Sequence, residues 1–246
     1  MSFPFNLGDY ISPVNKLNKN KIAVIGCLHG NEKIGKYVID TLQQIEFENF
    51  DMRCILANGE AMEQDKRYID TDLNRCFPGK NDGNHEERLA ASLVERIKNS
   101  DYVIDIHSTV SKTRDFAIIT SESPEVMKLA SYIPLETVVF MEPVIAKGGS
   151  LIDHARCGVS IEFDCRRDRR YVTGVVLECI YNLRNSIPTK VKQEHYSVFG
   201  SLEGTGNFVF PNFRETTVNG ETFCPVFSGE TAFKDILCLK ARRVRR

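Results

Sequence analysis

The chain has 246 residues, 42% of them hydrophobic and 26% charged, with a formal net charge of −1 at pH 7. These values are typical of a globular protein with one large domain, and they argue against a nucleic-acid or membrane-surface partner. No apolar stretch reaches the roughly 18 residues that a membrane-spanning helix needs. Residues 1–10 lack the pattern of a secretory signal peptide, so we expect a cytoplasmic protein with reduced, mostly buried cysteines.

Apolar periodicity predicts alternating strands and helices over most of the chain. Residues 21–27 are rich in Ile and Val, as in a buried strand, and residues 33–44 follow with an apolar stripe at helical spacing. The further elements expected in chain order are a strand over 52–57, a helix over 86–98, strands over 102–106 and 116–120, a helix over 124–132 capped by Ser123, strands over 137–141 and 159–163, and a helix over 172–185. This alternation is typical of an α/β sheet covered by helices on both faces.

The pattern changes after about residue 188. Glycines then separate short β-rich pieces, and no helix is expected. We therefore divide the chain into an α/β domain over 1–188 and a small β-rich C-terminal subdomain over 189–246. The chain ends in the strongly basic stretch ARRVRR over 241–246, which we expect to be a solvated tail in preference to a contact with an anionic partner.

Two histidines and a glutamate occupy positions where an α/β sheet places functional groups. His29 and Glu32 follow the first strand, and His107 follows the strand expected over 102–106. Functional sites gather at the carboxyl ends of such strands. Two imidazoles and one carboxylate form the protein ligand set of a catalytic zinc site, with one position left for water. Gly30 lies between the first two residues and would let the backbone bend.

Other roles for these residues remain open at this stage. His29 also fits a capping or surface histidine, and His107 fits a core histidine with satisfied hydrogen bonds. The HxxE spacing is common by chance. The chain has five histidines among 246 residues, and this rarity favours a shared site.

Residues 66–79, KRYIDTDLNRCFPG, belong to a long polar connection. Arg67, Asn74 and Arg75 alternate there with apolar residues that would anchor the loop against the protein. An anchored loop with two guanidinium groups and an amide suits the capture of a carboxylate, because arginine binds carboxylates through paired hydrogen bonds. We therefore expect a small-molecule substrate that carries a carboxylate.

The strand GVSIEFD places Glu162 on the face opposite to its apolar neighbours. A glutamate near the end of an otherwise apolar strand either pairs with a nearby arginine, Arg166 or Arg167, or acts as a general base.

Together these residues resemble the succinylglutamate desuccinylase/aspartoacylase family, which is related to zinc carboxypeptidases. The resemblance rests on four stretches: HGNE at 29–32, RYIDTDLNRCFPG at 67–79, DIHST at 105–109 and GVSIEF at 158–163. It covers roughly residues 20–185 and implies a carboxypeptidase-like mixed sheet flanked by helices. In the C-terminal part, only position and length are similar.

The resemblance also implies a function. It implies a zinc-dependent hydrolase that cleaves the amide bond of an N-acylated, preferably acidic, amino acid. One zinc ion per chain would be held by three ligands, His29, Glu32 and His107. Glu162 would act as general base and acid, and Arg67 would polarise the scissile carbonyl. The substrate carboxylate would be held by Asn74 and Arg75.

The contact to a second acidic group of the substrate is less defined. Arg156, six residues before Glu162, is one candidate, and Arg166 is another. The stretch EFDCRRDRR lacks the small turn expected in the family after the general base, so the identity of the substrate stays open. Asp105 is a candidate hydrogen-bond partner beside the ligands, although a buried structural role fits it nearly as well.

Two other functions are retained. The same zinc, glutamate and arginine set would serve a carboxypeptidase that acts on a short or modified peptide. The non-enzymatic alternative is a metal-binding or interaction protein whose basic tail recruits an anionic partner. A homo-oligomer is compatible with the sequence.

Overall fold

The computed structural model of the chain describes residues 20–47, 51–146, 148–206 and 208–245. The segment over 1–10, in which we find no signal-peptide pattern, lies outside these ranges. Within the described ranges, no helix is both long and apolar enough to cross a lipid bilayer.

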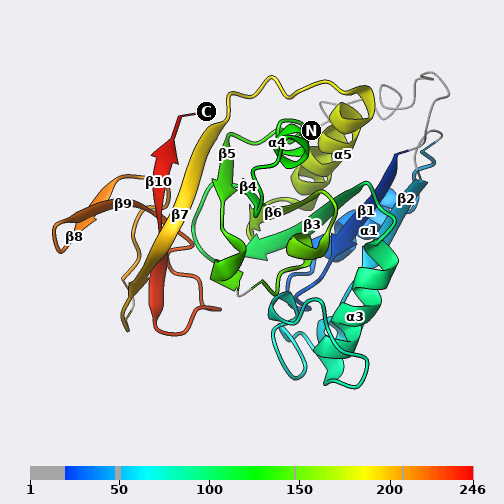
Figure 1. Ribbon diagram of the computed structural model, residues 1–246, viewed down its shortest axis with the longest axis horizontal. Coiled ribbons are helices and arrows are strands. Elements are labelled where there is room, and N and C mark those ends of the chain that lie inside the picture. The colour runs from blue at the N-terminus through cyan, green and yellow to red at the C-terminus, as the bar shows by residue number, and fades with distance from the viewer. Residues whose placement is uncertain (1–19, 48–50, 147, 207, 246) are drawn as a thin grey trace.

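The strands in the described part of the chain form one mixed sheet of ten strands, in the order β2-β1-β3-β6-β4-β5-β7-β10-β9-β8 (Figure 1). The strands are β1 (Lys21–Gly26), β2 (Asp51–Leu56), β3 (Tyr102–Thr109), β4 (Phe116–Ile119), β5 (Thr137–Phe140), β6 (Gly158–Asp164), β7 (Glu194–Glu203), β8 (Thr216–Val218), β9 (Glu221–Val226) and β10 (Ile236–Val244). Strands β2, β1, β3 and β6 run parallel, and β4 pairs antiparallel with β6. The predicted fold class, a mixed sheet flanked by helices, is therefore confirmed.

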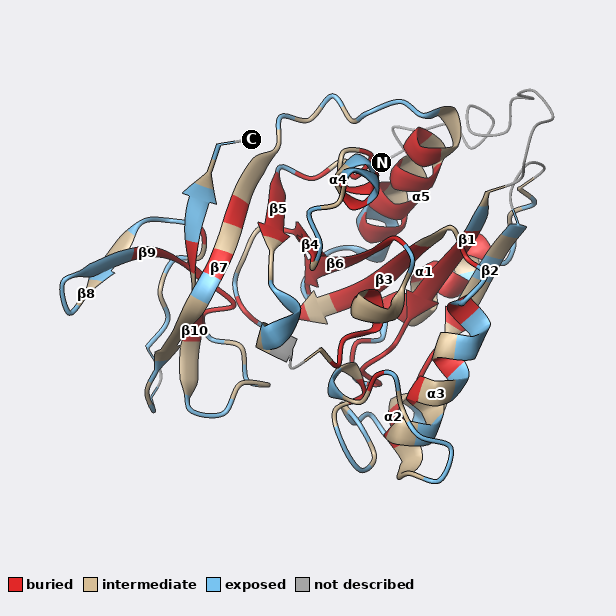
Figure 2. Ribbon diagram, in the orientation of Figure 1, coloured by how far each residue is buried: buried red, intermediate tan, exposed pale blue. Residues whose placement is uncertain are grey.

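Helices cover both faces of the sheet, as the alternating pattern predicts. They are α1 (Ile34–Leu42), α2 (Gly59–Glu63), α3 (His85–Ile97), α4 (Pro124–Ala130) and α5 (Arg169–Asn185), with short 3-10 turns η2 (Leu73–Arg75), η3 (Pro143–Ala146) and η4 (Leu151–His154). One buried cluster packs α1, α4 and α5 against the sheet, and a second contains α3. Side-chain alternation along β1 separates the two clusters, since Ile22 and Val24 belong to the first and Ala23 and Ile25 to the second. Figure 2 shows the central strands buried as a result.

Side-chain caps determine where two of the helices begin. The Ser123 hydroxyl accepts the backbone N–H of Val126 at the start of α4, as predicted. Helix α5 begins at Arg169, three residues before the expected start. The Asp168 carboxylate accepts the backbone N–H of Arg170 there, which satisfies a donor that would otherwise lack a partner in the first turn.

The β-rich C-terminal part continues the sheet. Strand β7 pairs in parallel with β5, and β10, β9 and β8 follow antiparallel. A third buried cluster joins this part to the rest, because the ring of Phe116 in β4 lies 5.2 Å from the ring centroids of both Phe213 and Phe227. The boundary at residue 188, as a limit between folding units, stays a prediction.

The expectation of a solvated basic tail is wrong for residues 241–244. They belong to β10, which lies between β7 and β9. Arg243 forms an ion pair with Glu194 (2.5 Å), and the Arg242 guanidinium lies 4.4 Å from the ring centroid of Phe199. The basic composition therefore reflects exposed side chains on a strand whose backbone is hydrogen-bonded to its neighbours.

The long polar connection after β2 is held by one buried carboxylate. The Glu86 side chain accepts the backbone N–H groups of Ile69 (2.7 Å), Asp70 (2.9 Å) and Thr71 (3.1 Å) and the side-chain amide of Asn58 (3.0 Å). Burial by itself raises the pKa of a carboxyl group, but these donors outweigh it and lower the pKa of Glu86. The 66–79 loop, which carries Arg67 and Arg75, is thereby anchored through its backbone N–H groups.

We predict that Glu86→Gln lowers the free energy of unfolding by roughly 1–3 kcal/mol, because an amide NH₂ cannot accept the backbone N–H groups that the carboxylate accepts. Urea unfolding at pH 7 measures the difference. The lowered pKa sets its pH dependence. Ionised Glu86 stabilises the fold above the unfolded-state pKa of about 4.3, and this contribution is lost as the pH falls through the lower folded-state value.

Glu95→Gln is the matched control, because Glu95 is an exposed glutamate of the same helix. Surface substitutions of this kind usually change stability by less than about 0.5 kcal/mol. Equal stability of the two variants across the pH range would contradict the anchoring role of Glu86.

Candidate active site

The predicted site residues come from three neighbouring strands. His29 lies three residues beyond the end of β1, His107 lies in β3, and Glu162 lies in β6. Strand β3 runs three residues past its expected end, so His107 is within the strand. His107 is the register partner of Glu162, and the two side chains therefore leave the same face of the sheet side by side. The residues meet at the carboxyl ends of parallel strands.

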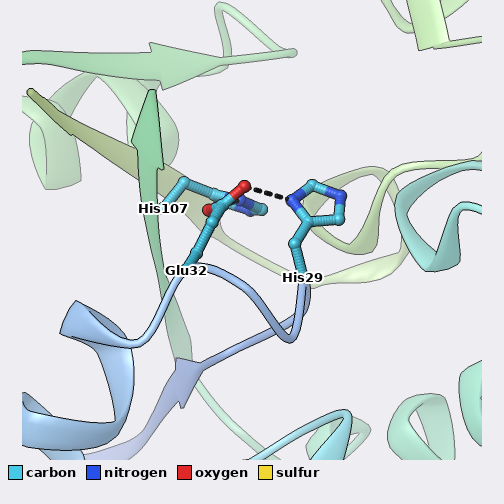
Figure 3. Close-up of side chains that lie close together, drawn as sticks. All are labelled: His29, Glu32 and His107. Carbon is cyan, nitrogen blue, oxygen red and sulfur yellow. Dashed lines mark hydrogen bonds and ion pairs between the residues drawn. The ribbon is translucent and has the colours of Figure 1, made fainter. Parts of the chain in front are cut away.

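His29, Glu32 and His107 are buried and point toward one another (Figure 3). Glu32 contacts both imidazoles: its Oε1 lies 2.6 Å from His29 Nδ1, and its Oε2 lies 3.1 Å from His107 Nδ1. One ligand atom from each residue lies within 4.8 Å of the other two. Two imidazole nitrogens and a carboxylate oxygen at this spacing are able to hold one metal ion.

Each imidazole contacts a further carboxylate through its other nitrogen. His107 Nε2 lies 2.6 Å from Asp105 Oδ2, and His29 Nε2 lies 3.0 Å from Asp72 Oδ1. A histidine that ligates a metal through one nitrogen usually donates the N–H of the other nitrogen to a carboxylate or carbonyl. The arrangement therefore leaves the two Nδ1 atoms to face a cation.

The carboxylates set the charge of this cluster. Burial lowers the pKa of an imidazole, but at His29 the Glu32 and Asp72 carboxylates outweigh it and raise the pKa. At His107 the Asp105 and Glu32 carboxylates have the same effect. Although burial opposes it, the imidazoles hold the pKa of Glu32 below its usual range. The buried carboxylates thus favour a positive charge at this place. A divalent cation supplies such a charge, so the donor set fits a bound cation.

Glu162 lines the same cavity, and its acidity is shifted in the opposite direction. Burial raises the pKa of Glu162 to about 8; His107 opposes this shift, and the Glu32 carboxylate adds to it. A carboxyl group that titrates near neutral pH is able both to take and to return a proton.

The polar residues of the 66–79 loop occupy different places. We call His29, Glu32 and His107 the ligand cluster. The Arg67 guanidinium donates to Asp72 (Nε to Oδ2, 3.1 Å) and to Glu32 (Nη1 to Oε1, 3.3 Å), and its Nη2 lies 2.9 Å from His29 Nε2. Arg67 therefore contacts the ligand cluster directly. The side-chain oxygen of Asn74 accepts a backbone N–H at the start of η4 (2.9 Å). Arg75 is exposed, donates to the Asn74 carbonyl oxygen (2.7 Å), and lines the cavity.

Gly30 has a different role from the expected one. Its φ is not in the left-handed region. A Cβ at this position would lie 2.3 Å from the backbone of Ala61 and Met62, and the Gly30 N–H donates to the Arg67 carbonyl oxygen (3.1 Å). Glycine is needed because α2 and the arginine loop approach the backbone at this point.

The two arginines that the sequence suggests for a second acidic group of the substrate, Arg156 and Arg166, lie away from the cavity. Arg156 pairs with Asp101 (3.1 Å) and its side chain is 77% exposed. It precedes β6, whereas Glu162 lies near the end of that strand, so Arg156 is at the opposite end of the sheet from the cavity. Arg166 pairs with Asp164, and neither arginine lines the cavity formed by the described residues. We therefore leave Arg156 out of the site.

The ligand cluster opens onto a cavity of about 860 Å³. Its walls include residues from two parts of the chain that the sequence does not connect with the site. The first part is 141–145 with 150–152, and the second is 227–239 of the C-terminal part. The Glu230 carboxylate of the second part accepts a hydrogen bond from the hydroxyl group of Thr109, which lies two residues after His107. Asp72 was missed as well, since no spacing distinguishes it from Asp70 in the same loop. These contacts join residues far apart in the chain, and no local pattern marks them.

Comparisons with known proteins agree on one family. Residues 18–164 match the family model described as the succinylglutamate desuccinylase/aspartoacylase catalytic domain. The chain is 34% identical over 128 residues to a probable aspartoacylase of Trichodesmium erythraeum. The aligned region covers 46% of this chain and 44% of that protein. It is 34% identical over 109 residues to N-acyl-aromatic-L-amino acid amidohydrolase (carboxylate-forming) A of Danio rerio. That aligned region covers 37% of this chain and 33% of that protein. The chain thus spans about half the length, or less, of these relatives.

A solved structure agrees in fold over nearly the whole chain. The crystal structure of murine aminoacylase 3 superposes with a TM-score of 0.76 at 20% identity, covering 94% of this chain and 97% of that chain. The family model spans more than half of the 246 residues, from before β1 to the end of β6, and includes the ligand cluster and Glu162. By this match, the chain belongs to the succinylglutamate desuccinylase/aspartoacylase family.

Proposed function

We propose that this protein is a zinc-dependent amidohydrolase that removes the acyl group from an N-acyl amino acid. The observation on which the proposal rests is the buried cluster of His29, Glu32 and His107, with Glu162 beside it on the neighbouring strand. The names of two relatives, an aspartoacylase and an N-acyl-aromatic amino acid amidohydrolase, support the reaction class. They differ in substrate, so they leave the side chain of the amino acid undecided.

Zinc is the metal that this ligand set suits best. Catalytic zinc sites use two imidazoles and one carboxylate, whereas magnesium prefers oxygen ligands and water. A zinc ion held by the three side chains would supply Lewis-acid chemistry. The carboxylates of Asp105 and Asp72 would keep the two imidazoles oriented through N–H···O hydrogen bonds.

Glu162 has the position and the acidity that the proton transfers need. It takes a proton from the water that attacks the amide carbonyl carbon, and it returns that proton to the leaving amine nitrogen as the C–N bond breaks. The raised pKa of Glu162 favours the second transfer, because the carboxyl group then holds its proton near neutral pH. The acyl group leaves as a carboxylate, and the amino acid leaves as its ammonium form, which takes up the second proton of the attacking water.

The two arginines have separate tasks in this proposal. Arg67 contacts Glu32 and His29 of the ligand cluster directly, and it stabilises the negative charge that develops on the carbonyl oxygen. Arg75, with the amide of Asn74, holds the carboxylate of the substrate. Fixing the substrate by its carboxylate brings the scissile bond to the cluster, and part of the barrier is removed by this positioning.

A carboxypeptidase reaction is the alternative that the same residues permit, because it also cleaves an amide next to a carboxylate. An assay that compares N-acetyl amino acids with dipeptides of the same amino acids separates the two reactions. Faster hydrolysis of the dipeptides would favour the peptidase.

We predict that Glu162→Gln lowers kcat for amide hydrolysis by roughly 10²- to 10⁴-fold, which is the usual contribution of general acid–base catalysis. Elemental analysis should find wild-type zinc content, because Glu162 is not one of the three ligands. Glu142→Gln is the control, since it removes another carboxyl group that lines the cavity and should leave kcat unchanged. Wild-type turnover of Glu162→Gln would exclude its role as the base.

The ligand assignment predicts that His107→Ala does not retain zinc during dialysis against a chelator, because two protein ligands hold the ion much less tightly than three. His154→Ala is the control; this histidine contacts the Gly148 carbonyl oxygen outside the ligand cluster. Elemental analysis gives the zinc content of both variants. One tightly held zinc ion per chain in His107→Ala would refute the assignment.

Asp105→Asn should weaken zinc binding by about 10- to 100-fold, the usual effect of removing the outer partner of a ligating histidine. The amide keeps the volume of the carboxylate but is not an anionic acceptor for His107. Competition with a coloured chelator measures the zinc Kd. Asp101→Asn, at the other end of the sheet, is the control, and an unchanged Kd in Asp105→Asn would disprove the orienting role.

A further inference from the structure

Part of the wall of the active-site cavity is apolar. Buried members of the third core cluster, among them Ile152 and Phe227, line the cavity directly. Three partly buried side chains that pack on this cluster, Met141, Ile145 and Phe233, also line it. The ligand cluster and this apolar wall belong to the same cavity, so a substrate that reaches the ligand cluster is also close to the wall.

Contacts on both sides hold Phe233 in place. Its ring lies 5.8 Å from that of Phe227 between centroids, at an interplanar angle of 85°. The Phe233 N–H donates to the Glu230 carbonyl oxygen (3.4 Å), and the Glu230 carboxylate accepts from the Ala232 N–H (3.0 Å) and the Thr109 hydroxyl. Because Thr109 is in β3, these bonds fix the turn over 230–233 relative to the ligand cluster, and the aromatic wall is formed before a substrate binds.

The charges on this side disfavour a second carboxylate on the substrate. Glu142 and Glu230 line the cavity here. The lysines that line it, Lys66 and Lys234, are exposed. An ion pair with an exposed ammonium group contributes little, whereas a carboxylate placed against the apolar wall would lose its hydration.

We propose that the substrate carries one carboxylate, held by Arg75, and a large uncharged group that packs against Phe233, Ile145 and Met141. This inference rests on the proposed function and specifies its substrate class, in place of the acidic group expected from the sequence. Phe233 is then a specificity-determining residue that contacts the substrate and takes no part in proton transfer.

Four amides test the inference on the zinc-loaded wild-type protein. N-acetyl-L-phenylalanine and N-benzoylglycine each carry one carboxylate and place an aromatic ring on opposite sides of the scissile bond. N-acetyl-L-aspartate and N-succinyl-L-glutamate carry additional carboxylates. The better aromatic amide should have a kcat/KM at least about 10-fold above both acidic amides, as expected when a pocket matches an apolar group. A higher kcat/KM for either acidic amide overturns the inference and leaves the proposed function in place.

Binding gives a readout that does not depend on turnover. Zinc-loaded Glu162→Gln is titrated calorimetrically with the same four amides. If none of the amides is hydrolysed by the wild-type protein, the proposed function fails, and the titration decides the inference by itself. Tighter binding of an aromatic amide supports the apolar wall, and equal or tighter binding of an acidic amide overturns it.

Substitutions at two neighbouring residues, Phe233 and Lys234, then separate recognition of an apolar group from recognition of a second carboxylate. Phe233→Ala should lower kcat/KM for the preferred aromatic amide by roughly 10- to 100-fold and leave N-acetylglycine unaffected, and Phe233→Leu should restore most of the loss. Lys234→Ala, in the same turn, should leave the aromatic amide unchanged. Thermal unfolding checks that all three variants are folded. A loss for the acidic amides in Lys234→Ala, with no loss for the aromatic amide in Phe233→Ala, overturns the assignment.

Discussion

Glu32 contacts the imidazoles of His29 and His107 at the same time, and this convergence constrains the rest of the structure. It requires β1 and β3 to be adjacent and in register, and they are, with Gly26 opposite Ile106. His107 is therefore level with the turn that carries His29 and Glu32. The pairing of β3 with β6 on its other side then sets Glu162 beside His107. Strand order and register thus determine the distance between the ligand cluster and the general base of the proposed mechanism.

A buried group of charges is stable only when each charge has partners, because removal from water is costly. The carboxylates of Asp105 and Asp72 give the imidazoles these partners. Asp72 is in turn held by Arg67, and the loop that carries both is held by the buried Glu86. Support therefore extends outward from the cluster in successive hydrogen bonds, and each layer limits the movement of the one inside it. Such rigidity is what a metal site needs if its ligands are to keep a productive geometry.

The C-terminal strands complete the cavity as well as the sheet. Their third core cluster packs against β4 and reaches the cavity through Phe227. The contact between Glu230 and Thr109 ties this part to the strand that carries His107. The family match covers the ligand cluster and three residues of the apolar wall, Met141, Ile145 and Ile152, whereas Phe227 and Phe233 lie beyond it in the C-terminal part.

Local patterns in the sequence predicted most strands and helices up to residue 188, but not α2 or the individual strands β7 to β10. The stretches around His29, His107 and Glu162 were sufficient to name residues that meet. These inferences succeed because alternation, helical spacing and short motifs depend on neighbours in the chain. They failed for Arg156, which precedes β6 and lies at the far end of the sheet, and for the basic stretch that pairs as β10. Tertiary structure alone decided that Asp72 supports His29 across 43 positions and that Glu230 reaches Thr109 across 121. Contacts at such separations depend on strand order and register, which arise from packing the whole sheet and leave no mark in any short stretch of sequence.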